Sequence, residues 1–167
     1  MRLFFAVWPP EESARALALW ARSVEREAGG KATAHDKIHL TLAFLGGVES
    51  QKAIAAAQRV KAAPHELAME QARYWRQNNI VWAGPREAPQ PLLDLVERLK
   101  LELYRAEYIL EQRPFAAHVT LLRKARLPKS LPPLPPVRWP VSEFLLMQSV
   151  LSSAGSSYQP LARFELQ

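Results

Sequence analysis

Residues 39–46 read HLTLAFLG and residues 118–123 read HVTLLR, so the phrase His-x-Thr-Leu occurs twice in a chain with four histidines. Side chains alternate between the two faces of a strand, so the histidine and threonine of each phrase share one face. The apolar residues between them would anchor the opposite face in a core. One such strand is typical of a histidine that is simply accommodated in a sheet. Two copies in matching places would instead bring two imidazoles and two hydroxyls into one cleft.

Composition limits the class of protein. The 167 residues are 49% hydrophobic, which is enough for one domain or two tightly joined lobes with a sizeable core. The longest apolar runs are far shorter than the roughly 20 residues of a membrane span, so no membrane partner is expected. The chain has no cysteine, which excludes disulfides, thiolate metal sites and a cysteine nucleophile and favours a cytoplasmic location. The net charge of +6 favours anionic partners such as RNA.

The first half of the chain predicts five elements in order. Residues 2–9 form a short apolar run closed by prolines, which is typical of a buried strand. Apolar residues at three- and four-residue steps predict a helix over residues 11–29. Residues 38–47 are the first His-x-Thr strand, residues 51–63 a second helix, and residues 66–75 alternate as a strand does.

The second half repeats this order. A strand is predicted over residues 78–84 and an amphipathic helix over residues 89–106, followed by the second His-x-Thr strand at 117–123. Residues 124–140 are proline-rich and predict an ordered loop or polyproline connector. Two closing strands, 142–153 and 161–167, are expected, with residues 155–158 as the turn between them.

This order predicts an α+β protein with two pseudo-symmetric lobes, each an antiparallel sheet with helices on its outer face. The internal repeat covers roughly residues 1–76 and 77–167, and the whole chain, residues 1–167, is expected to be a single bilobal domain with the active site in the cleft between the lobes. Such a cleft suits a phosphate. Cleavage of a phosphodiester at neutral pH requires a base and an acid, and two histidines with pKa values of about 6.5 can divide these roles.

Five ordered stretches give the chain a specific resemblance. It resembles the two-histidine (HxTx) phosphoesterases, and within them the bacterial RNA 2′,3′-cyclic phosphodiesterase family, also called the 2′-5′ RNA ligase family, which has a LigT-like fold. The stretches that carry the resemblance are RLFFAVWPP (2–10), IHLTLAFLG (38–46), IVWAG (80–84), RPFAAHVTLLR (113–123) and SVLSSAGSSYQPLARFEL (149–166).

The resemblance implies a role for each site residue. His39 would donate a proton to the O3′ leaving group, and His118 would accept a proton from water, so that a 2′,3′-cyclic phosphate opens to a 2′-phosphate. Thr41, Thr120 and Arg123 would bind the phosphate. The resemblance implies no cofactor and no metal. The residues alone do not distinguish the donor from the acceptor.

Other side chains are weaker candidates. In a regular strand Arg123 would face away from His118, so it reaches the cleft only if the strand ends, twists or bulges near Leu122. A surface arginine at the end of a strand is the alternative. Four aromatic residues are candidates for stacking on bases, although strand burial favours the core for each: Phe44, Tyr74, Trp75 and Trp82.

The expected function is therefore hydrolysis of RNA or oligonucleotide 2′,3′-cyclic phosphate ends, tRNA-derived ends included, by a metal-independent monomer. Three alternatives stay open at this point. The same site could join a cyclic phosphate to a 5′-hydroxyl as a 2′-5′ linkage. The chain could bind RNA ends without turnover, although paired histidines are not needed for that. The substrate could also be another cyclic phosphate.

Overall fold

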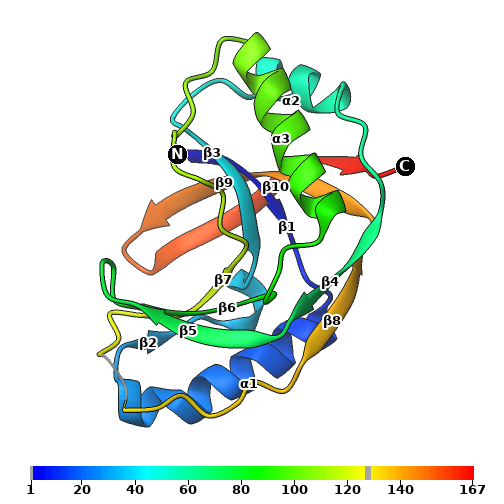
Figure 1. Ribbon diagram of the computed structural model, residues 1–167. Helices are drawn as coiled ribbons and strands as arrows, with labels where there is room; N and C mark the ends of the chain where they lie inside the picture. Colours follow the sequence, from blue (N-terminus) through cyan, green and yellow to red (C-terminus); the bar gives the residue numbers. More distant parts are fainter. Residues whose placement is uncertain (1, 127–128) are drawn as a thin grey trace.

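The strands form two antiparallel sheets with three α-helices outside them, as the computed structural model shows for residues 2–126 and 129–167 (Figure 1). This confirms the predicted α+β class. None of the helices in these residues combines the length and apolarity needed to cross a membrane. The elements are β1 (Arg2–Val7), α1 (Glu11–Ala28), β2 (Lys31–Ala32), the 3-10 helix η1 (His35–Lys37), β3 (Leu40–Gly46), α2 (Ser50–Gln58), β4 (His65–Met69), β5 (Gln71–Trp75), β6 (Ile80–Gly84), α3 (Gln90–Arg105), β7 (Val119–Arg123), β8 (Val137–Val141), β9 (Glu143–Ser152) and β10 (Gly155–Glu165).

The main sheet has the strand order β10-β9-β1-β3-β7-β6-β5, with β2 paired to β7. Its centre is the junction of β3 and β7, the two strands that follow the histidines. These strands meet through one antiparallel residue pair, Leu40 and Val119. The first lobe is therefore β10-β9-β1-β3, and the second lobe is β7-β6-β5 with β2. A separate two-stranded sheet pairs β4 with β8.

The helices are exchanged between the halves of the sequence. Helix α1, from the first half, packs against β2 and β7 of the second lobe and against β8 of the separate sheet. Helix α3, from the second half, packs against β3 and α2 of the first lobe. Figure 1 shows α1 at one end of the molecule and α2 and α3 at the other. Because each lobe requires both halves of the chain, we infer that the two lobes fold as one domain.

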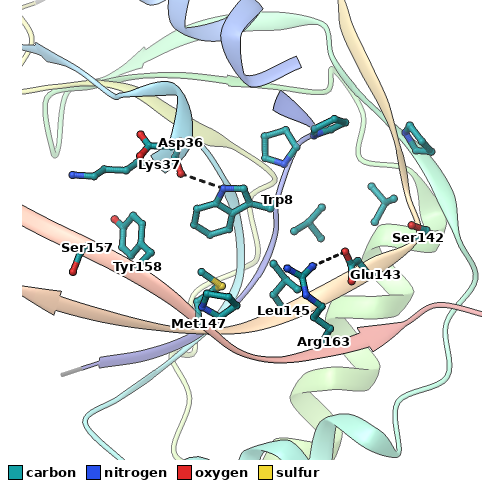
Figure 2. A pocket seen from close by; sticks show the side chains of 16 residues that line it. Trp8, Asp36, Lys37, Ser142, Glu143, Leu145, Met147, Ser157, Tyr158 and Arg163 are labelled. Atoms are coloured by element: carbon teal, nitrogen blue, oxygen red, sulfur yellow. Dashed lines mark hydrogen bonds and ion pairs between the residues drawn. The ribbon is translucent and has the colours of Figure 1, made fainter. Parts of the chain in front are cut away.

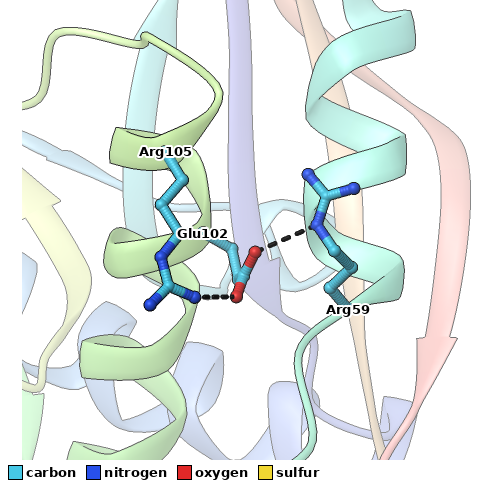
Figure 3. A network of polar contacts seen from close by, with 3 residues as sticks. All are labelled: Arg59, Glu102 and Arg105. Carbon is cyan, nitrogen blue, oxygen red and sulfur yellow. Dashed lines mark hydrogen bonds and ion pairs between the residues drawn. The ribbon is translucent and has the colours of Figure 1, made fainter.

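Amphipathic spacing accounts for the helical packing. Helix α1 buries Leu17, Trp20 and Val24 at three- and four-residue steps, and α3 buries Leu95 and Leu99 in the same way. The ends of the two helices of the first lobe are joined by ion pairs. Glu102 of α3 binds Arg59, at the end of α2, and Arg105, each at 3.0 Å (Figure 3). Arg59 and Arg105 are largely exposed, so these pairs contribute at most about 1 kcal/mol each.

Strand β1 is buried on both faces, because apolar side chains pack against each face. Leu3, Phe5 and Val7 enter the main core on one face. On the other face, which is the side of the cleft, a small second cluster forms around β1 and β9, with Trp8 and Tyr158 packed against it. This cluster consists of Phe4, Ala6, Leu145 and Met147.

Four details differ from the predictions. The helix predicted over residues 51–63 ends at Gln58, because Arg59 is its C-cap and the chain continues without helical structure to β4. The predicted strand 66–75 is two strands, because β4 leaves the main sheet at Glu70 to pair with β8. The proline-rich segment 124–140 contains β8, whose Pro140 is tolerated because β8 is an edge strand; residues 127–128 of this segment lie outside the described residues. The predicted turn at 155–158 belongs to β10. The chain turns at residues 153–154 instead. The Ser152 hydroxyl stabilises this turn, because it accepts a hydrogen bond from the Ala154 amide at 3.3 Å and donates one to the Gly155 carbonyl at 3.1 Å.

Candidate active site

The two predicted histidines lie diagonally across the junction of β3 and β7, at the centre of the main sheet. His39 directly precedes Leu40, and His118 directly precedes Val119, the paired residues that join the lobes. In this antiparallel register, His39 comes beside Thr120 and Thr41 beside His118. Leu40 and Val119 are fully buried, whereas the four polar side chains are only half-buried. The two imidazoles and two hydroxyls therefore face one cleft. They form a square in which the two histidines occupy one pair of diagonal corners and the two threonines the other pair.

Each imidazole is oriented by a backbone carbonyl two residues earlier. The Nδ1 atom of His39 lies 2.8 Å from the Lys37 carbonyl oxygen, and Nδ1 of His118 lies 2.8 Å from the Ala116 carbonyl oxygen. A carbonyl only accepts hydrogen bonds, so Nδ1 carries the hydrogen in both residues. The other ring atom, Nε2, is then an acceptor in the neutral form and can receive or give a proton in the cleft. His65 makes a similar bond to Ala63 at 3.0 Å, so this contact alone does not identify a site.

Aromatic rings enclose His39. The Trp8 indole lies parallel to the imidazole, with ring centroids 4.5 Å apart and an angle of 9° between the planes. Phe4 and Tyr158 complete the enclosure at 5.2 and 5.3 Å. Two successive carbonyls of η1 hold the stacked pair, because Trp8 Nε1 donates to the Asp36 oxygen at 3.3 Å while His39 bonds to the oxygen of the next residue.

His118 has a comparable but more open setting. The Trp75 ring lies 4.7 Å away and the Trp82 ring 6.3 Å away, both edge-on to the imidazole. Trp75 comes from β5 and Trp82 from β6, so these partners are nonlocal, as are those of His39. The sequence analysis missed Trp8 and Tyr158 as neighbours of His39. Trp8 follows β1 directly, but only the pairing of β1 with β3 brings it to the histidine.

Burial and a nearby positive charge make both histidines hard to protonate. The pKa of His39 falls to about 4, mainly because burial disfavours the charged imidazolium, and Arg123 and His118 lower it further. The backbone hydrogen bond to Lys37 opposes this fall. The pKa of His118 is also lowered, first by burial and then by Arg123, with the bond to Ala116 opposing. Both histidines are therefore neutral at pH 7 in the free protein.

A bulge brings Arg123 to the cleft. Trp82 pairs with Thr120, but the preceding residue Val81 pairs with Leu122, so β7 holds one extra residue, Leu121. The extra residue reverses the alternation, because Leu121 and Leu122 are both buried and Arg123 is exposed. Arg123 thus lies on the side of the histidines, whose pKa values it lowers. The bulge near Leu122 that the sequence analysis required is present.

Strand β3 has the same bulge at the same distance from its histidine. Thr41 pairs with Ala6 and Ala43 with Phe5, so Leu42 is the extra residue. The residue that corresponds to Arg123 is then Phe44, which is 59% exposed and whose ring lies 6.0 Å from Phe4. The expectation that strand burial would place Phe44 in the core is wrong for this reason.

Of the other stacking candidates, Trp82 is buried, as strand burial favoured, whereas Tyr74 and Trp75 lie on opposite sides of β5. Trp75 is half-buried beside His118, on the side of the cleft. Tyr74 does not lie where it could stack on a base. It packs against the main core, and its hydroxyl is engaged by Asn79 Oδ1 at 2.7 Å and the Ala125 oxygen at 3.3 Å. Neighbouring side chains of a strand face opposite sides, so only one of the two can reach the cleft.

Within residues 2–126 and 129–167, no group of three or more His, Cys, Asp or Glu side chains is arranged to hold a metal ion. His35, which is spaced four residues from His39, lies in η1. The polar side chains brought together at the junction of β3 and β7 include two imidazoles, two hydroxyls and, beyond the bulge of β7, one guanidinium.

Comparison with known proteins agrees with this geometry. The LigT like Phosphoesterase family model matches residues 7–82. The chain is 35% identical to a protein of Escherichia coli strain K12 named RNA 2′,3′-cyclic phosphodiesterase, over 99% of this chain and 96% of that protein. It is 33% identical to a Thermus thermophilus protein of the same name, over 99% of the chain and 90% of that protein. The crystal structure of E. coli LigT complexed with 3′-AMP superposes with a TM-score of 0.92 at 33% identity, covering 99% of this chain and 98% of the other. Since the match extends over both lobes and both histidine strands, the chain belongs to the LigT-like phosphoesterase family.

Proposed function

We propose that this protein hydrolyses the 2′,3′-cyclic phosphate at an RNA end to a 2′-phosphomonoester. The observation that carries the proposal is the pair of imidazoles on adjacent central strands, each held through Nδ1 so that Nε2 is free for proton transfer. The names of the E. coli and T. thermophilus relatives support the same reaction.

The proposed step balances two protons. His118 Nε2 removes a proton from water as the water oxygen attacks phosphorus, and the bond from phosphorus to O3′ breaks. His39 Nε2 gives its proton to O3′, so the product has a free 3′-hydroxyl and a 2′-phosphate. Thr41 and Thr120 donate hydrogen bonds to the non-bridging oxygens, and the Arg123 guanidinium balances their negative charge.

His39 must acquire a proton before it can donate one. In the free protein its pKa is about 4, partly because Arg123 is close. A bound cyclic phosphate brings one negative charge, which offsets Arg123 and attracts an imidazolium. The Trp8 ring beside His39 adds a cation–π contact for the charged form. We infer that the substrate takes up a proton with it when it binds, and that the rate has a bell-shaped pH dependence.

The test uses a short RNA that ends in a 2′,3′-cyclic phosphate, with and without EDTA. We expect a 2′-phosphate product that is insensitive to EDTA, and rates at least about 100-fold lower in His39→Ala and His118→Ala, because each removes one proton-transfer group. His65→Ala is the matched control, since His65 has the same local hydrogen bond outside the cleft, and its rate should stay at the wild-type level.

Different outcomes contradict different parts of the proposal. Tight binding of the RNA without turnover would leave only an RNA-end-binding module. Loss of the rate with EDTA would contradict the metal-independent mechanism. A 2′-5′-linked product, formed in preference to the 2′-phosphate when a 5′-hydroxyl RNA is present, would replace hydrolysis by ligation.

We further infer that one chain acts alone, because β3 and β7 of the same chain supply both histidines. The absence of cysteine suits a reducing compartment such as the cytoplasm, where tRNA-derived ends are among the RNA ends that could serve as substrates.

A further inference from the structure

Each side of the cleft has an aromatic side chain that ties a neighbouring turn to the main sheet. On the side of His39, Trp8 donates a hydrogen bond to the Asp36 carbonyl of η1 (Figure 2). On the side of His118, Tyr74 of β5 makes a comparable contact with the turn that follows β7. The Tyr74 ring packs against the main core and does not face the cleft. Its hydroxyl therefore acts on the site, if at all, through the backbone that it holds.

Tyr74 reaches the end of β7 by crossing β6. Tyr74 pairs with Val81, and Val81 pairs with Leu122, so the three side chains share the core face of the sheet. The Tyr74 hydroxyl extends beyond them to the Ala125 carbonyl oxygen, 3.3 Å away. Arg123 lies between Leu122 and this contact, with its side chain on the opposite face. The chain is thus held from the core side at the point where it carries Arg123 into the cleft.

Asn79, in the turn between β5 and β6, completes this network. Its backbone carbonyl accepts a hydrogen bond from the Ala125 amide at 2.9 Å, and its Oδ1 atom accepts one from the Tyr74 hydroxyl at 2.7 Å. Asn79 and Lys124 both have a left-handed backbone, with φ of +55° and +54°. Asparagine adopts this conformation more readily than lysine does. Lys124, which directly follows Arg123, therefore depends on the surrounding contacts to keep it.

The position of Arg123 depends on its backbone, because no other side chain fixes the guanidinium. Within residues 2–126 and 129–167 it forms no ion pair. Its neighbour across β2 is a second cation, Lys31. Arg123 is also the last residue of β7, and the ends of elements open more easily than their centres. The bond from Ala125 to Asn79 continues the pairing of β7 with β6 beyond Arg123 and so opposes this opening.

We propose that Tyr74 and Asn79 are positioning residues for Arg123, because they fix the turn after β7 and thereby keep the guanidinium on the cleft side. The inference rests on the proposed function where it concerns the phosphate that Arg123 would bind. It assigns the Tyr74 hydroxyl a part in the site although this hydroxyl touches no reacting group.

The two histidines report where the guanidinium lies. Burial lowers the pKa of both, and the positive charge of Arg123 lowers both further, as His118 does for His39. If the guanidinium moves away from the cleft, both pKa values should rise. NMR titration of the imidazole protons measures this directly and needs no substrate.

Tyr74→Phe removes the hydroxyl and leaves the ring in the core. Both histidine pKa values should rise, as in Arg123→Gln, and inorganic phosphate should bind about three- to tenfold more weakly, the factor that corresponds to one lost hydrogen bond. Asn79→Gly keeps the left-handed backbone and the carbonyl but removes Oδ1, and it should change both readouts in the same direction. A second variant keeps the test valid if one of them misfolds.

Tyr108→Phe is the matched control. It removes a hydroxyl that donates to a backbone carbonyl, that of Glu49 at 2.9 Å, but lies beyond the end of α3. Its titrations and its phosphate affinity should equal those of the wild type.

A double variant distinguishes positioning of Arg123 from a general loosening of the second lobe. Tyr74→Phe introduced into Arg123→Gln should change neither readout further, because no charge is left to misplace. The same change in both backgrounds would overturn the inference, as would wild-type titrations and phosphate affinity in both Tyr74→Phe and Asn79→Gly. If the wild type does not hydrolyse the cyclic phosphate, the proposed function fails, and the titrations still decide the role of Tyr74 and Asn79.

Discussion

Arg123 influences both histidines because a single bulge turns its side chain into the cleft. Its positive charge lowers the pKa of His39 and that of His118. The same charge is proposed to bind the phosphate, so one residue helps to keep both histidines neutral and attracts an anion to the cleft. Both effects can be tested by replacing the guanidinium with a neutral polar side chain.

The Arg123→Gln variant is expected to raise the pKa of both histidines and to weaken phosphate binding. A lost positive neighbour stabilises each imidazolium, so NMR titration of the imidazole protons should show both pKa values moving up toward 6.5. Inorganic phosphate should bind at least about tenfold more weakly, by roughly 1.4 kcal/mol, since a charged hydrogen bond is lost. Arg126→Gln, which removes a charge from an exposed residue three positions later, is the control. Unchanged titrations in Arg123→Gln would contradict the assigned electrostatic role.

At the scale of the elements, β2 holds the end of β7 where Arg123 begins to leave the sheet. Lys31 of β2 pairs with Arg123. The preceding residue, Gly30, has φ of +76° and lies so close to β7 that a Cβ atom there would collide with the Arg123 carbonyl oxygen. Gly46, at the end of β3, has a similar φ of +79° but no atom within 4 Å of the same position. A comparison of substitutions at the two glycines therefore distinguishes the cost of backbone strain from the cost of close packing.

Gly30→Ala and Gly46→Ala should differ in their effect on stability. Gly46→Ala should lower the free energy of unfolding by about 1 kcal/mol, because the only cost is an alanine in the left-handed backbone conformation. Gly30→Ala also has to displace β7, so a loss of about 3 kcal/mol is expected. Urea denaturation measures both values, and phosphate affinity should fall in Gly30→Ala because Arg123 moves. Equal losses in the two variants would show that the contact with β7 is unimportant.

The elements also show where local sequence is a good guide. The spacing of apolar residues predicted α1 and α3, because an amphipathic helix needs no knowledge of its partner beyond a core. The same reasoning missed β8 and joined β4 to β5, since pairing of β4 with β8 connects segments about 70 residues apart in the chain. The two bulges could not be predicted from local spacing either. Leu42 and Leu121 are ordinary strand residues, and only the registers with β1 and β6 make them extra.

For the whole molecule, the neutral, half-buried imidazole of His39 couples the active site to stability. Its pKa is about 4 in the folded protein and about 6.5 in an unfolded chain. Between these values the unfolded state binds more protons, so stability rises with pH in this window. The contribution is complete above about pH 6.5 and is lost as the pH falls toward 4. The lowered pKa of His118 acts in the same direction.

Removing His39 should therefore flatten the acid side of the stability curve. Wild type is expected to lose about 2 kcal/mol through His39 between pH 7.5 and pH 5, and His39→Asn should lack this part of the loss. The measurement is the free energy of unfolding in urea at both pH values. His35→Asn serves as the control, because His35 lies outside the cleft in η1. A wild-type curve that falls no more steeply than that of His39→Asn would contradict a buried, neutral His39.

The sequence by itself determined the helices, the alternation of the strands and the two repeated phrases that contain His39, Thr41, His118 and Thr120. These features depend on local spacing, which any segment carries within itself. Only the tertiary structure decided that β3 and β7 adjoin, that a bulge turns Arg123 and Phe44 toward the cleft, and that Trp8 and Tyr158 enclose His39. The physical reason is that each of these contacts joins strands whose pairing register is set by the whole sheet and is not written in either strand alone.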